Sequence, residues 1–304
     1  MLTKEIVEKF IEVKLEMPDW REQLSNSKLN FFLELIKRYK QKIYYQNFSY
    51  SVKSVEEMTT PTEESSIYDV TQTPGAACIQ MNYFTQALLE YLGYDAFLVS
   101  APVDVIPHAN NHMVVIIRIP DSGKTELYMV DAGLPWPVPE AVNLNKLPNV
   151  VQAGGFKLAY RFNSETNKYE RVVIGGDPIK SGNDFSSETE EKVDITFDLN
   201  PLKFKDFVEA MRITFTEPQS TFFLNMAFMF RFISLKSAGD FEYVSCFART
   251  MVVGTNTDRQ VFTYETFTDM VPDILKYFPK MDPAQVQLAC EKFEKQRLAD
   301  KGSD

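Results

Sequence analysis

The chain contains three cysteines and two histidines, and one of the cysteines stands where it could act as a nucleophile. Cys78 follows an irregular Pro-Gly-Ala turn, at the point where a helix is predicted to begin. Backbone N–H groups and the positive end of a helix dipole favour a thiolate over a thiol, and they can also bind an oxyanion. The alternative is a small or buried, inert residue at a helix start, which is the commoner situation for any single cysteine.

A histidine and an aspartate follow on successive predicted strands. His112 opens the apolar strand His112–Ile119, and Asp131 stands at the end of the next strand, beyond a turn at residues 121–124. If the strands pair as a hairpin, the carboxylate can hold one imidazole nitrogen while the other nitrogen faces the sulfur. Each residue alone also fits an ordinary turn or strand end. The combination with Cys78 favours an activated nucleophile.

The remaining cysteines and histidine are assigned other roles. His108 lies in a loop with no strand to fix it, so we expect an exposed loop residue. Cys246 falls in an apolar strand and Cys290 in an amphipathic helix, so both are expected to be packing residues. No cysteines or histidines show the spacing of metal ligands on a predicted helix, and no metal is expected.

The composition sets limits on the class of protein. With 304 residues, including 24 Phe and 14 Tyr, the chain has enough apolar material for a large core and is not disordered. A net charge of −10 argues against sequence-independent nucleic-acid binding. The N-terminus is charged throughout and no uncharged run approaches the ~20 residues of a membrane helix. An odd number of cysteines favours a reducing compartment, so we expect a cytoplasmic protein with no membrane partner.

Helices must position Cys78, and strands must position the other two groups. The apolar pattern predicts helices over 3–15, from an N-cap at Ser27 to about residue 43, and over 78–92, with a polar loop at 54–66. A short apolar run stands at 96–100, and strands are predicted at 112–119, 126–130, 157–162 and 169–174, followed by a polar surface insertion at 175–192. The last third is mixed, with helices at 203–213, 266–277 and 283–297 and strands at 226–233 and 241–253.

The residues around the three candidate groups resemble the arylamine N-acetyltransferase family. That family carries R-G-G-x-C-x-x-x-N at its nucleophile, a histidine that opens an apolar strand, and then V-D-[AV]-G; the similar stretches here are Gly75–Asn82, His112–Val115 and Val130–Gly133. Its I-P-F-E-N-L and P-x-S-x-F elements are similar to Ile43–Phe48 and Pro218–Phe222. The similarities occur in the correct order, and the chain resembles a divergent member of the family.

The resemblance implies an α+β fold built in three parts around a cysteine-protease-like Cys-His-Asp core. Residues 1–95 would form a helical bundle that carries Cys78. Residues 96–200 would form a β-barrel that carries His112 and Asp131, and residues 201–304 would form an α/β lid domain. The predicted order of helical, β and mixed segments agrees with this division.

The resemblance also implies a reaction. The Cys78 thiolate would take an acetyl group from acetyl-CoA, with His112 moving the proton and Asp131 orienting His112, and an arylamine, hydrazine or arylhydroxylamine would then accept it. Gly133, Gln219, Ser220 and Thr221 would border the CoA groove. Acetyl-CoA is then a substrate, no permanently bound cofactor is expected, and the implied role is xenobiotic metabolism. The CoA phosphates need a local patch of basic side chains or backbone N–H groups. The sequence of this acidic chain does not show where that patch lies.

Several residues depart from the family pattern. The family's arginine and second glycine before the nucleophile are Pro74 and Ala76, and its upstream glutamate is Gln46. If the arginine and glutamate pair in relatives, losing both leaves no orphaned charge. Leu134 and Pro135 replace the usual Phe-Gly, so the acceptor preference of relatives is not carried over.

Two other functions stay open. One is a different thiol acyl enzyme, such as an amide hydrolase or an acyltransferase with another acyl donor. The other is a relative without activity that binds CoA, a small molecule or a partner. The presence of Cys78, His112 and Asp131 together counts against the second alternative.

Overall fold

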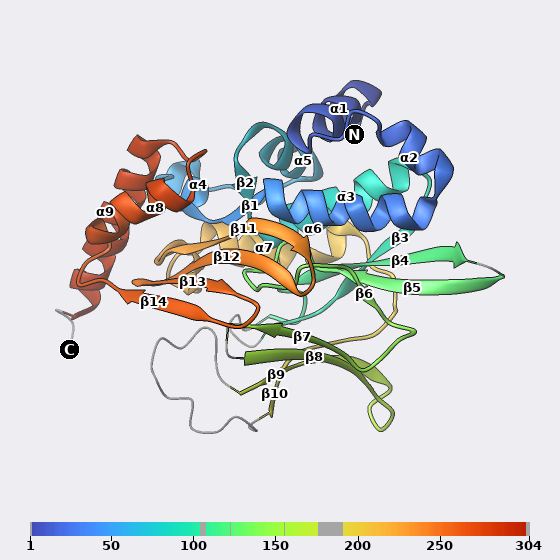
Figure 1. Ribbon diagram of the computed structural model, residues 1–304. Helices are drawn as coiled ribbons and strands as arrows, with labels where there is room; N and C mark the ends of the chain where they lie inside the picture. Colours follow the sequence, from blue (N-terminus) through green and yellow to red (C-terminus); the bar gives the residue numbers. More distant parts are fainter. Residues whose placement is uncertain (1, 104–107, 122, 155, 176–190, 302–304) are drawn as a thin grey trace.

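The computed structural model describes residues 2–103, 108–121, 123–154, 156–175 and 191–301. The fold is α+β, with helices gathered at the two ends of the chain and three sheets between them (Figure 1). The polar insertion predicted at 175–192 falls mostly on residues 176–190, which lie outside the described residues. In the described part of the chain, no helix has the length and apolarity to cross a membrane.

The N-terminal helices begin where capping residues predict. The Thr3 hydroxyl accepts a hydrogen bond from Ile6 N at 3.3 Å, and the Ser27 hydroxyl accepts one from Asn30 N at 3.2 Å. The predicted helices at 3–15, 27–43 and 78–92 are confirmed. The helical elements of this part are α1 (Lys4–Lys9), a π-helical turn (Phe10–Lys14), α2 (Trp20–Asn26), α3 (Lys28–Lys42), α4 (Phe48–Ser51), a 3-10 turn (Val55–Glu57), α5 (Glu63–Gln72) and α6 (Cys78–Tyr91).

The predicted polar loop at 54–66 is wrong at its end, because α5 begins at Glu63. Thr62 caps this helix: its hydroxyl accepts a hydrogen bond from Ser65 N at 3.1 Å, and Thr62 N donates to the Ser65 hydroxyl at 2.9 Å. The polar composition of the segment led to the prediction of a loop, although the capping box at Thr62 marks the start of a helix.

Two four-stranded sheets occupy the middle of the chain. The hairpin that carries the candidate histidine and aspartate is confirmed, with Val115 paired to Val130 and Asp121 to Lys124. The strands are β3 (Asp95–Ser100), β4 (Met113–Asp121), β5 (Lys124–Val130) and β6 (Val142–Asn143) in one sheet, and β7 (Asn149–Ala153), β8 (Phe156–Asn163), β9 (Lys168–Ile174) and β10 (Glu191–Phe197) in the other.

The expected β-barrel is wrong for the described residues, since each sheet is open with two edges. A barrel needs a continuous ladder that returns to its first strand. Here β3 meets Leu202 through the single bridge Leu98↔Leu202, and Val103 meets β10 through the single bridge Val103↔Ile195. Isolated bridges join the two sheets without closing them.

The third sheet joins the two ends of the chain, in the order β14-β13-β12-β11-β1-β2. The strand predicted at 241–253 is wrong as one strand, because it turns at Ala248, which has a φ of 50°. No Gly or Asn marks that turn in the sequence. The strands are β1 (Tyr44–Gln46), β2 (Gly75–Ala76), β11 (Phe228–Ser237), β12 (Asp240–Phe247), β13 (Thr250–Thr255) and β14 (Arg259–Thr263).

The C-terminal helices pack over a second core. In Figure 1, α8 and α9 lie together next to α4, apart from α1, α2 and α3. The helices are a 3-10 turn (Phe204–Phe207), α7 (Val208–Thr216), 3-10 turns at Phe222–Leu224 and Thr268–Met270, α8 (Val271–Tyr277) and α9 (Pro283–Lys301). Buried apolar residues in or next to α8, α9, the turn before α8, α4 and the third sheet form what we call the C-terminal cluster: Tyr44, Phe48, Ala227, Met229, Val244, Cys246, Met251, Phe267, Met270, Ile274, Phe278, Met281, Val286, Ala289, Cys290 and Phe293.

Candidate active site

Cys78 is the first residue of α6, as the sequence predicts. The N-cap residue is Ala77, whose side chain has no oxygen to bind the N–H groups of the first turn. Cys78 is partly exposed, whereas Cys246 and Cys290 are buried. Cys78 therefore combines partial exposure with a place at a helix end that keeps its partial positive charge.

Neutral hydrogen bonds hold the segment that leads to Cys78. Tyr44 N donates to Pro74 O at 3.1 Å, and the Gln46 side-chain amide donates to Gly75 O at 2.8 Å. Gly75 lies so close to β1 that an added Cβ would come within 1.8 Å of Tyr44 O. The residues that depart from the family pattern, Pro74 and Gln46, thus position β2 without an ion pair.

The structure brings His112 and Asp131 to Cys78. His112 immediately precedes β4 and Asp131 immediately follows β5, and His112 Nε2 lies 2.8 Å from Asp131 Oδ2. The Cys78 side chain forms a hydrogen bond with the His112 ring, which leaves Nδ1 as the nitrogen that faces the sulfur. His112 and Asp131 are only 3% and 2% exposed. The contacts are those that a nucleophile, a base and an orienting carboxylate would need.

The pair is charged in its resting form. Burial acts to lower the pKa of His112, but the Asp131 carboxylate and Cys78 outweigh it and raise that pKa well above 6.5. For Asp131, burial acts to raise the pKa, and His112 with Arg171 outweighs it and holds the pKa below 3.8. An imidazolium next to a carboxylate is the form expected near neutral pH.

His108, by contrast, lies in a turn away from this group. Its Nδ1 accepts a hydrogen bond from Asn110 N at 3.3 Å. It is half-buried, so the expectation of a fully exposed residue is wrong. None of the hydrogen bonds described for His108 involves a carboxylate.

Asn82 links the nucleophile helix to the two strands, and sequence reasoning did not include it among the site residues. Its amide donates to Asp131 Oδ1 at 2.9 Å and to Met113 O at 2.7 Å, and its oxygen accepts from Ala132 N at 2.7 Å. Asn82 lies four residues after Cys78, one helical turn along the same face. That spacing, present in the matching motif, was the available signal.

Two buried cations also stand by the carboxylate, and nothing in the sequence pattern marked them. Arg171 on β9 donates to Asp131 Oδ2 at 3.4 Å and through Nε to Asp194 Oδ2 at 2.7 Å. Lys40 on α3 donates to Val138 O at 2.9 Å. Burial lowers the pKa of Lys40 to about 8, although the charge of Asp131 opposes the change.

Of the residues expected to border CoA, Gly133 lies at Cys78. A Cβ at Gly133 would fall 2.3 Å from Cys78 Cα, so the loop after β5 touches the nucleophile only because this residue is glycine. Gln219 and Ser220 are exposed in a turn, and Ser220 bonds to Glu217 at 3.0 Å. Thr221 is buried, and its hydroxyl accepts from Phe223 N at 3.1 Å. No described contact joins these three to Cys78.

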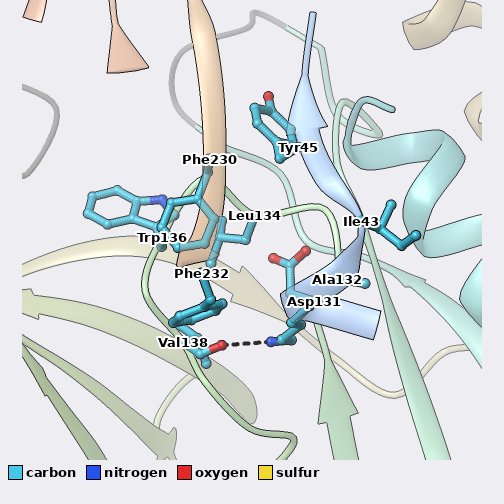
Figure 2. Close-up of a pocket in the computed structure, with 10 residues that line it drawn as sticks. Ile43, Tyr45, Asp131, Ala132, Leu134, Trp136, Val138, Phe230 and Phe232 are labelled. Carbon is cyan, nitrogen blue, oxygen red and sulfur yellow. Dashed lines mark hydrogen bonds between the residues drawn. The ribbon is translucent and has the colours of Figure 1, made fainter. Parts of the chain in front are cut away.

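A small cavity borders Asp131. Figure 2 shows Trp136, Phe230 and Phe232 on one side of it and Ile43 and Asp131 on the other. Leu134 and Trp136, which follow Gly133, are part of its wall, so one of the two residues that depart from the family pattern there, Leu134, lines this cavity. Its volume of about 10 Å³ holds one water molecule. An aromatic acceptor does not fit there in this conformation.

A larger cleft of about 300 Å³ lies beyond Val138, next to Glu140, Asn149 and Gly239. None of the residues that line it belongs to the Cys78 group. In the described part of the chain, no three His, Cys, Asp or Glu side chains gather as metal ligands would.

Solved structures share this fold at low sequence identity. An arylamine N-acetyltransferase from Mycobacterium abscessus superposes with a TM-score of 0.65 at 14% identity, over 96% of this chain and 99% of that one. The Mycobacterium marinum enzyme in complex with CoA gives 0.65 at 14%, over 90% and 99%. The Salmonella typhimurium enzyme gives 0.66 at 11%, over 96% and 99%.

Comparisons of the sequence itself give one match, to a family model. No curated protein sequence matches the chain. The N-acetyltransferase family model matches residues 28–237, which is more than half of the chain and contains Cys78, His112 and Asp131. Together with the fold, this match establishes that the chain is a divergent member of the N-acetyltransferase family and an acyltransferase.

Proposed function

We propose that the protein transfers acetyl groups from acetyl-CoA to arylamines, hydrazines or arylhydroxylamines through an acetyl-Cys78 intermediate. One observation supports this above all: a partly exposed sulfur lies against a buried imidazole that is hydrogen-bonded to a buried carboxylate. Membership of the N-acetyltransferase family supports acetyl-CoA as the acetyl donor, and the relative that was solved with CoA is consistent with this donor.

In the first half-reaction, the Cys78 sulfur attacks the thioester carbonyl of acetyl-CoA. The carbon–sulfur bond to CoA breaks, and the imidazolium of His112 gives its proton to the departing thiolate. Backbone N–H groups of the first turn of α6 stabilise the oxyanion that forms in between. In the second half-reaction, the amine attacks the acetyl carbon and neutral His112 takes the amine proton, which restores the thiolate–imidazolium pair.

The parts of the chain divide the work. We assign the nucleophile to residues 1–95, the imidazole and carboxylate to 96–200, and a lid over the substrate to 201–304. Gly133, Gln219, Ser220 and Thr221 are proposed to border CoA. The three free cysteines fit a reducing compartment, so we place the reaction in the cytoplasm, in the metabolism of foreign amines.

Initial-rate kinetics test the proposal. With acetyl-CoA and a hydrazine varied together, a ping-pong cycle gives parallel lines in double-reciprocal plots. Intersecting lines would mean a ternary complex and would contradict an acetyl-Cys78 intermediate.

The same assay separates the alternatives. Release of CoA that does not depend on the acceptor would indicate a thiol acyl hydrolase. CoA binding without turnover would indicate a relative that retains only the fold, and turnover with a longer acyl-CoA alone would change the donor.

A further inference from the structure

Arg171 has the largest side chain that is fully buried in the described residues, and its position suggests a role in the cycle. It stands on β9 between β8 and β10, with its guanidinium shared by Asp131 and Asp194. A buried guanidinium is costly unless it is paired, so the two carboxylates hold it in place. Asp194 is the outer partner, with a side chain that is 19% exposed.

The charge around Asp131 changes during the proposed reaction. In the resting enzyme, the His112 imidazolium faces the carboxylate at 2.8 Å. In the acetyl-enzyme the sulfur is uncharged, and the proton has left with CoA, so the imidazole is neutral. A buried carboxylate that loses its cation tends to take up a proton. Arg171, whose Nη1 lies 3.4 Å from Asp131 Oδ2, carries a positive charge that does not depend on the proton of His112.

We propose that Arg171 is a positioning residue that keeps Asp131 ionised and turned toward His112 while Cys78 carries the acetyl group, and that Asp194 moderates its charge. This inference rests on the proposed function, since it concerns the acetyl-Cys78 intermediate.

The consequence is felt in the second half-reaction, where neutral His112 must accept the amine proton. The positive charge of Arg171 opposes a second positive charge on the imidazole, so removing it raises the pKa of His112. Removing Asp194 leaves the charge of Arg171 less balanced, so it lowers the pKa of His112. The two changes therefore act in opposite directions, which a loss of packing would not produce.

Other titratable groups surround the pair from each neighbouring element. They are Lys40 on α3, Tyr45 on β1, Cys78 on α6, Tyr160 on β8, Arg171 on β9 and Asp194 on β10. Arg171→Gln and Asp194→Asn change only the last two, and they are compared in one common Cys78→Ala background that leaves the other groups in place.

Because the chain has only two histidines, the pKa of His112 can be measured directly. In a Cys78→Ala background, which imitates the uncharged sulfur of the acetyl-enzyme, the ring signals of His112 are titrated by NMR, with His108→Asn for assignment. Arg171→Gln is expected to raise the His112 midpoint and Asp194→Asn to lower it, each by up to about one pH unit. Arg161→Gln is the control, because it removes a 42%-exposed arginine from the adjacent strand. It should leave the midpoint unchanged.

The functional readout is the rate at which a hydrazine discharges acetyl-Cys78, measured against pH in single turnovers. The midpoint of that profile should move up with Arg171→Gln and down with Asp194→Asn. At pH values below that midpoint, each unit of upward shift slows discharge about tenfold. The rate of Cys78 acetylation should change less, because imidazolium is then the active form.

Two results would overturn the inference: shifts of the same sign in both variants, or an equal loss in both half-reactions with unchanged midpoints. If Arg171→Gln does not fold, Asp194→Asn decides, and a midpoint that stays or rises refutes the proposal. If the wild-type protein forms no acetyl-Cys78, the proposed function fails, while the NMR titration still reports on Arg171.

Discussion

Cys78 and the two cysteines of the C-terminal cluster carry the same side chain in opposite surroundings. Cys78 is partly exposed at a helix start and is hydrogen-bonded to a charged imidazole. Cys246 and Cys290 lie among apolar side chains, where burial raises the pKa of Cys290 to about 12 and also raises that of Cys246. Residue type alone therefore does not define a reactive thiol; the helix end and the neighbouring charges do.

The largest effect that can break this comparison is removal of the nucleophile. Cys78→Ala is expected to reduce acetyl transfer to a hydrazine by about 10⁴-fold or more. Cys246→Ala and Cys290→Ala are the matched controls, and per folded molecule they should keep the activity. Acetylation that survives in Cys78→Ala, or is lost in a folded Cys290→Ala, would reverse the assignment.

Next in size is the loss of the base and its orienting group. His112→Asn and Asp131→Asn should each lower the rate by about 10²- to 10⁴-fold, the range for a positioned general base. His108→Asn replaces the other histidine and should leave the rate unchanged. Rates at a fixed acetyl-CoA concentration test this, and equal losses at both histidines would show that His112 has no special role.

The rate of alkylation sharpens the contrast between the thiols. Because the His112 pKa is raised above 6.5, the imidazolium next to Cys78 persists at neutral pH. Iodoacetamide at pH 7 should therefore alkylate Cys78 much faster than Cys246 and Cys290, which are buried and whose pKa values burial raises.

Peptide mass spectrometry gives the rate for each cysteine separately. A rate at Cys78 no higher than at the two buried cysteines would contradict this contrast.

The charge of His112 should also affect stability. The His112–Asp131 ion pair stabilises the fold fully below pH 6.5, as long as Asp131 is ionised, and this contribution is lost as the pH rises through the raised pKa of His112.

The smallest effect concerns the contact between the loop after β5 and the nucleophile. Gly133→Ala places a methyl group 2.3 Å from Cys78 Cα and should cost about 1–3 kcal/mol of unfolding free energy. At Gly239 an added Cβ meets nothing within 4 Å, so Gly239→Ala should stay within about 0.5 kcal/mol. Urea unfolding measures both. Equal effects would mean that the close approach at Gly133 is not maintained in solution.

The positions of Cys78, His112 and Asp131 in the fold could be predicted because each residue is tied to a local signal. Cys78 follows a turn and starts an apolar helical pattern, and a readable hairpin joins the strands next to His112 and Asp131. Local signals do not specify long-range pairing. The expected barrel was wrong because a sheet closes only if its two edge strands pair. In the described residues, the edge strand β3 meets Leu202 through the single bridge Leu98↔Leu202.

Arg171 and Lys40, which lie beside Asp131, could not be predicted from the sequence for the same reason. Arg171 reads as an ordinary charged residue in a strand, and only the packing of β9 against the end of β5 brings it to Asp131. Lys40 reads as part of the polar face of α3, yet it is 6% exposed. Their roles depend on contacts across 40 to 98 positions of sequence, which no periodicity encodes.

The most direct test of the central claim is the intact mass of the protein after brief exposure to acetyl-CoA, with Cys78→Ala alongside. We expect one acetyl group on the wild-type chain, located at Cys78 by peptide mapping, that a hydrazine or arylamine removes. The variant should carry none. An unmodified wild-type protein that still binds CoA, or an adduct that persists in Cys78→Ala, would contradict acetyl transfer through this sulfur.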